Sequence, residues 1–148
     1  MAGFARERGM NLATPAPRWF WIAAIAAVLF EAYGCIVYLS YVTANPETFP
    51  ADQQALWKAT PVWVTAAFAI AVWSGLAGSA GLLLRRRWAV PLLGLSLLAV
   101  IVQMAGMAAT PGVLMTSAEL AQPLGIAVVC ALIYGLAHHA RRRGWLRS

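Results

Sequence analysis

Residues 19–42 read WFWIAAIAAVLFEAYGCIVYLSYV, and this stretch decides the fold class. Glu31 is its one charged residue, and at about 1.5 Å per helical residue the stretch is long enough to cross a hydrocarbon layer about 30 Å thick. The whole chain of 148 residues is 61% hydrophobic and 11% charged, with a mean hydropathy of +0.70. These values exclude a large soluble enzyme, a disulfide scaffold and a disordered tail. We therefore expect residues 19–42 to form a transmembrane helix.

Three more apolar runs follow, at residues 61–84, 88–109 and 120–137. The run at residues 61–84 has no charge, and the run at residues 88–109 ends at a Thr-Pro-Gly turn. The fourth run, at residues 120–137, is the shortest. The connection at residues 43–60 contains a partly polar segment, for which we expect a short interfacial helix. The pattern predicts an all-α integral membrane four-helix bundle that forms a single domain over residues 1–148.

Arginine clusters set the expected orientation in the membrane. Short loops rich in lysine and arginine stay on the cytoplasmic side. The N-terminus, the turn between the second and third spans and the basic tail at residues 138–148 are therefore predicted to be cytoplasmic, whereas residues 43–60 and 110–119 face out. This placement accounts for the net charge of +6. We therefore expect the lipid bilayer as a partner and do not expect nucleic acid. The expected topology and lipid anchors are Arg85, Arg86, Arg87, Arg141, Arg142 and Arg143.

Glu31 is the sharpest functional signal in the sequence. It lies about 18 Å from the cytoplasmic boundary of its span, near the middle of the bilayer, where an ionisable group needs a partner or a role. Most of its neighbours on the same helix face are small, so we expect the side chain to point into the bundle. At similar depths we expect a hydrogen-bonded polar cluster of Glu31, Tyr38, Trp73 and Gln103. Its preferred interpretation is a structural clamp, and the alternative is a carboxylate that titrates or binds a cation.

Small residues recur along one face of the span at residues 61–84. They are Ala67, Ala71, Gly75 and Ser79, with Gly78 beside them. Small residues let helix backbones approach closely in a membrane, so this face is predicted to be a packing seam. The spacing leaves open whether the seam meets another span of the same chain or a second protomer.

The remaining chemistry-bearing residues favour no catalytic site. Cys35 and Cys130 lie in different spans and outside any Cys-x-x-Cys pair, and His138 and His139 are adjacent, which is a poor arrangement for holding one metal or haem. The chain also lacks a phosphate-binding glycine loop. We therefore expect no metal, no cofactor and no enzyme activity.

Several motifs resemble a known family. They are PVWV at residues 61–64, AIAVW at 69–73, LLLRRRWAVP at 82–91 and FEAYGCIVY at 30–38. The chain is similar to an uncharacterised family of small bacterial four-span inner-membrane proteins, sometimes labelled "sugar transporter". The resemblance implies a location in the bacterial cytoplasmic membrane. That family more often has asparagine at the position of Glu31 and aspartate at that of Val37, which favours the structural clamp over proton coupling.

Two functions follow as hypotheses. The first is an accessory or interaction subunit, which packs into a homo-oligomer or a larger membrane complex through the small-residue seam. The alternative is a small dimeric proton-coupled transporter that uses the intramembrane carboxylate, because four spans and one acid in the first helix are similar to the layout of the small multidrug exporters.

Overall fold

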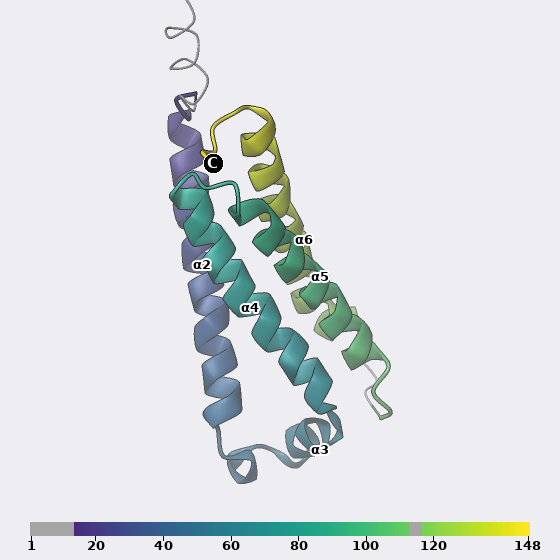
Figure 1. The fold of residues 1–148 in the computed structure, drawn as a ribbon. Coiled ribbons are helices and arrows are strands. Elements are labelled where there is room, and N and C mark those ends of the chain that lie inside the picture. Colours follow the sequence, from purple (N-terminus) through teal and green to yellow (C-terminus); the bar gives the residue numbers. More distant parts are fainter. Residues whose placement is uncertain (1–13, 113–116) are drawn as a thin grey trace, which may run out of the picture.

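The computed structural model describes residues 14–112 and 117–148, and these parts of the chain are predominantly helical. The four long helices are α2 (Arg18–Thr43), α4 (Val62–Leu83), α5 (Ala89–Ala108) and α6 (Ser117–Arg142). Each is long and apolar enough to cross a membrane, and they run side by side as an elongated bundle (Figure 1). The predicted all-α membrane bundle is confirmed, and the chain is a multi-pass membrane protein.

The first three spans agree with their predicted bounds to within one residue at each end, whereas the fourth does not. Helix α6 begins at Ser117 and continues to Arg142, so the prediction that the fourth span is the shortest is wrong. The buried face of the helix extends beyond the predicted end at residue 137, since Ala140 is fully buried in the core. The residues from His138 to Arg142 therefore belong to a helix rather than to a separate tail.

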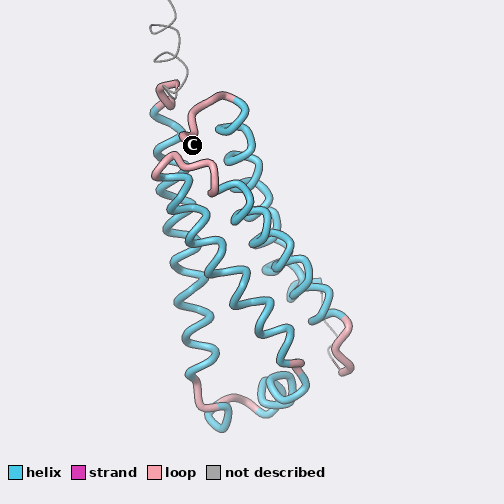
Figure 2. Tube along the Cα trace, in the orientation of Figure 1, coloured by secondary structure: helices cyan, strands magenta, loops and turns pink. Residues whose placement is uncertain are grey.

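Two short helices lie at one end of the bundle, between α2 and α4. They are η1 (Pro46–Thr48) and α3 (Ala51–Ala59), which corresponds to the short helix expected in this connection. Figure 2 shows both lying across the gap between the ends of α2 and α4. We refer to this end of the molecule as the α3 end.

Consecutive long helices are packed against one another, whereas α6 packs mainly on α5 and barely meets α4. The contact between α4 and α5 is close because a glycine lies at the crossing, where a larger side chain would hold the two helices apart. A Cβ atom at Gly78 would lie 2.7 Å from Leu93 Cγ and 3.0 Å from the backbone nitrogen of Leu93. The sparse contact of α6 with α4 leaves space inside the bundle for the cavity described below.

The opposite end of the bundle is closed by residues 143–148, which we call the C-terminal clasp. The backbone N–H of Arg87 donates to Arg147 O at 3.0 Å, and the N–H of Arg147 donates to Arg85 O at 2.5 Å. Leu146 is buried with Phe20 and Leu82 in one core cluster. The clasp thereby ties the turn between α4 and α5 to the start of α2, and the C-terminus lies beside that helix in Figure 1.

Candidate intramembrane site

The centre of the candidate site is the carboxyl group of Glu31, a residue that is 4% exposed in the middle of α2. Its Oε2 atom packs against Gly75 of α4, in space that any larger residue would occupy. A Cβ atom at Gly75 would overlap Glu31 Oε2 and lie 2.8 Å from the hydroxyl oxygen of Ser96 on α5. Helices α2, α4 and α5 therefore meet at this carboxyl group.

A cavity of about 540 Å³ adjoins the carboxyl group, and all four long helices contribute to its wall. The lining is mostly apolar, with few polar groups. Its polar side chains are Glu31, Ser96, Gln103, Gln122 and Tyr33, which is 66% exposed, joined by the thiol of Cys130. The apolar part includes Phe30, Met104 and Ile126. A volume of this size is typical of sites for small organic molecules, which bind through an apolar body and a few placed polar groups.

The structure brings together only part of the polar cluster expected from the sequence. Gln103 lines the same cavity as Glu31. Tyr38 instead stacks edge-on against Phe68, with ring centroids 5.4 Å apart. Trp73 is 47% exposed, so its predicted place in the cluster is wrong. Helix α4 turns its small residues inward, and a residue two positions from Gly75 points to the opposite side of the helix.

Ser96 and Cys130 are two members of the site that the sequence reasoning missed. Ser96 is 2% exposed, and its hydroxyl donates to Ala71 O at 2.7 Å. Its signal in the sequence is the spacing of seven residues from Gln103, which places both on one face of a helix. Cys130 is 6% exposed and lines the cavity beside Glu31. The thiol of Cys35 donates to Val72 O at 3.4 Å and is not part of the cavity wall.

The electrostatics of the site are those of an isolated acid. The sequence has no lysine or arginine in the middle of a span, and Glu31 is the one acidic residue at that depth. Within residues 14–112 and 117–148, no three His, Cys, Asp or Glu residues are grouped so as to hold a metal ion. A buried carboxylate without a cationic side chain beside it is stabilised by a proton or by a cationic ligand.

The seam on α4 is used within the chain. All five of its residues are buried: Ala67, Ala71, Gly75, Gly78 and Ser79. Gly78 faces Leu93 of α5, and Gly75 faces the carboxyl group from α2. The seam therefore packs the two helices that flank α4, and it presents no small-residue surface to a second protomer.

The expected arginine anchors gather at the end of the bundle that holds the C-terminal clasp. Arg85 is partly buried, and its Nε donates to Trp145 O at 2.7 Å while its Nη2 donates to Thr14 O. This partial burial and, to a smaller extent, the neighbouring Arg147 lower the pKa of Arg85. The other five anchors are exposed: Arg86, Arg87, Arg141, Arg142 and Arg143.

No protein-family model, curated protein or solved structure matches this chain.

Proposed function

We propose that this multi-pass membrane protein is a small transporter of a bacterial cytoplasmic membrane, and that it binds an organic monocation at Glu31 in exchange for a proton. The observation that carries the proposal is the placement of a buried carboxyl group, without a basic side chain at its depth, on the wall of a cavity of about 540 Å³. A carboxyl group in such a place is a functional-site candidate, because burying its charged form is costly unless a proton or a cationic ligand neutralises it.

The lining of the cavity favours an organic cation over a hydrated metal ion. Most of the exposed wall is apolar and includes the ring of Phe30 and the thioether of Met104. Methionine adapts to ligands of irregular shape, and aromatic rings attract cations over their faces. A metal ion that has shed its water would instead need several oxygen ligands from the protein at once. The proposed ligand has one positive charge on a mainly apolar body.

Proton coupling follows from competition for a single carboxyl group. The protonated acid is neutral and tolerates the apolar surroundings, whereas the carboxylate needs a cation beside it. Binding of a cation therefore favours release of the proton, and protonation favours release of the cation. The coupling needs no second titratable residue.

The subunit hypothesis stays a prediction. The small-residue seam by which such a subunit would meet another protein is buried within one chain. The dimeric form of the transporter hypothesis also stays a prediction.

The test is proton flux in vesicles reconstituted with the purified protein, using tetraphenylphosphonium as the organic monocation and an enclosed pH-sensitive dye. The wild-type protein is expected to move protons when a tetraphenylphosphonium gradient is imposed. Glu31→Gln is expected to reduce this flux to that of empty vesicles, because the amide does not ionise. Glu47→Gln is the matched control, since Glu47 is exposed in η1. Flux that is equal in wild type and Glu31→Gln would refute the proposal.

The proposed orientation has its own test. Eight arginines of the described residues lie in or beside the end that carries the C-terminal clasp: Arg18, Arg85, Arg86, Arg87, Arg141, Arg142, Arg143 and Arg147. Basic segments stay in the cytoplasm. A reporter enzyme that works only in the cytoplasm is therefore expected to be active when it is fused after residue 148, and one that works only outside the cytoplasm is expected to be inactive there. A fusion that is active only outside the cytoplasm would reverse the assigned topology.

A further inference from the structure

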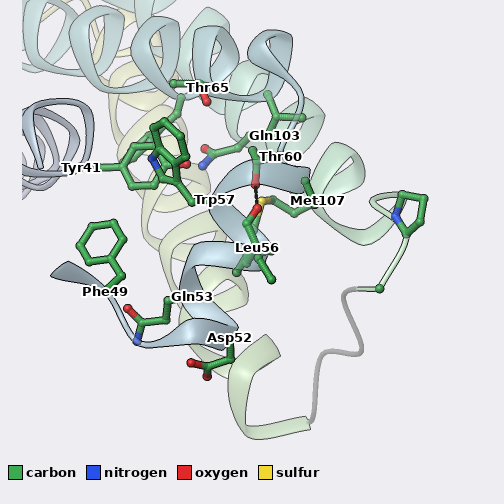
Figure 3. A pocket seen from close by; sticks show the side chains of 16 residues that line it. Tyr41, Phe49, Asp52, Gln53, Leu56, Trp57, Thr60, Thr65, Gln103 and Met107 are labelled. Carbon is green, nitrogen blue, oxygen red and sulfur yellow. Dashed lines mark hydrogen bonds between the residues drawn. The ribbon is translucent and has the colours of Figure 1, made fainter. Parts of the chain in front are cut away.

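A second cavity, of about 800 Å³, lies at the α3 end of the bundle, and we call it the vestibule. Figure 3 shows its wall, which is built from the side chains of α3 together with the neighbouring ends of the long helices. Polar and aromatic residues are prominent in the lining, among them Tyr41, Asp52, Gln53, Trp57 and Thr65. The vestibule is thus more polar than the cavity at Glu31, as suits a water-filled space.

The vestibule and the Glu31 cavity share part of their walls. Phe68 of α4 and two residues of α5, Gln103 and Met107, line both spaces. Gln103 and Met107 are one helical turn apart and therefore lie on the same face of α5. All three side chains are partly exposed rather than fully buried. The two spaces therefore adjoin at these three side chains.

On the other side of Glu31 the bundle is close-packed. Between the carboxyl group and the clasp, α2 contributes Ala24 and Ala27, which are 0% and 3% exposed, to a continuous core cluster. Leu82 and Leu146 are also fully buried or nearly so in this cluster. The exposed arginines beyond it repel an approaching cation.

We infer that water and cations reach Glu31 from the α3 end, through the vestibule and past the side chains of Phe68, Gln103 and Met107. Asp52 is exposed on the vestibule wall, where its negative charge favours the arrival of cations. Only the charge of the ligand rests on the proposed function, because the route is inferred from the two adjoining cavities and the packed core.

Two native cysteines allow the route to be tested without a ligand. Both cysteines are buried, with Cys35 5% and Cys130 6% exposed, but Cys130 lines the Glu31 cavity and Cys35 does not. The probe is a trimethylammonium-ethyl methanethiosulfonate, which is cationic and does not cross membranes. It is added to one face at a time of vesicles in which the orientation of the protein is known. Cys35→Ala leaves Cys130 as the reporter, and Cys130→Ala leaves Cys35 as the control.

The expected result is modification of Cys130 from the α3 end, slow or no modification from the clasp end, and no modification of Cys35 from either. Modification after unfolding in detergent shows that each thiol is competent to react. Reaction from the clasp end alone overturns the inference. Failure of the charged probe from both faces, with reaction of an uncharged bilayer-soluble maleimide, also overturns it and places the access route in the lipid between α2 and α6.

A variant of the shared wall sharpens the test. Gln103→Trp enlarges a side chain between the two spaces and is expected to slow modification of Cys130 from the α3 end severalfold. Val102→Trp is the matched control, because Val102 is 41% exposed and lines neither cavity. Equal slowing in both variants would contradict the assigned route. If Cys130 is modified as expected while the tetraphenylphosphonium flux is absent, the route stands and the proposed exchange fails.

Discussion

Replacing Gly78 with leucine is expected to lower the free energy of unfolding by roughly 3 kcal/mol, at the upper end of the usual range for overpacking. The reason is the close approach of α4 and α5, where even a Cβ atom would lie 2.7 Å from Leu93 Cγ and 3.0 Å from the Leu93 backbone nitrogen. A side chain can rotate away, but the backbone of α5 moves only if the two helices separate. The measurement is reversible unfolding in mixed micelles of rising SDS content, followed by circular dichroism.

Gly135→Leu is the matched control for this variant. Gly135 lies in α6, and a Cβ atom there meets no atom within 4 Å. The substitution gains helix propensity and creates no overlap, so stability is expected to be unchanged or slightly higher. If Gly78→Leu unfolds at the same SDS content as Gly135→Leu, the close packing of α4 on α5 does not exist in the folded protein.

Shortening Leu146 to alanine is expected to destabilise the protein by about 2–5 kcal/mol, the range for removing a large buried aliphatic side chain. Leu146 is 2% exposed although it lies only two residues from the last residue of the sequence. It packs in the cluster that contains Phe20 and Leu82, and the clasp holds that cluster closed. The same SDS titration measures the loss, and faster proteolytic cleavage within residues 143–148 is expected to accompany it.

Leu84→Ala provides the comparison, because Leu84 is 66% exposed at the same end of the bundle. The same atoms are removed, but little buried contact is lost, so the expected change is well under that of Leu146→Ala. Equal stability of the two variants would mean that residues 143–148 are not docked on the bundle.

The sequence determines the four spans, because hydrophobic length acts over whole segments. The ends of the first three helices follow from the apolar runs and their flanking residues. The fourth was predicted too short because its last turns carry His138, His139 and Arg141 on the surface while Ala137 and Ala140 are buried. A basic surface and a buried alanine face coexist on one helix, and hydropathy averages the two.

The inward orientation of Glu31 was also predicted from the small residues around it, and the carboxyl group is buried as that argument requires. Its neighbours were harder to predict, because equal depth in the membrane does not place two side chains on facing sides of their helices. Trp73 lies at a suitable depth yet is 47% exposed, whereas Ser96 was overlooked and is buried close to the carboxyl group. The rotation of each helix about its own axis decides whether a side chain at that depth points into the bundle or away from it.

The amino-acid sequence by itself determined that this protein is a helical membrane protein with one acid deep in its first span, because transfer of side chains from water to lipid depends on their composition. Only the tertiary structure decided that the seam on α4 is used within one chain, that the C-terminal clasp closes one end, and that the Glu31 cavity adjoins the vestibule. Those features depend on which helix faces meet and how closely, and contacts between residues distant in sequence set both.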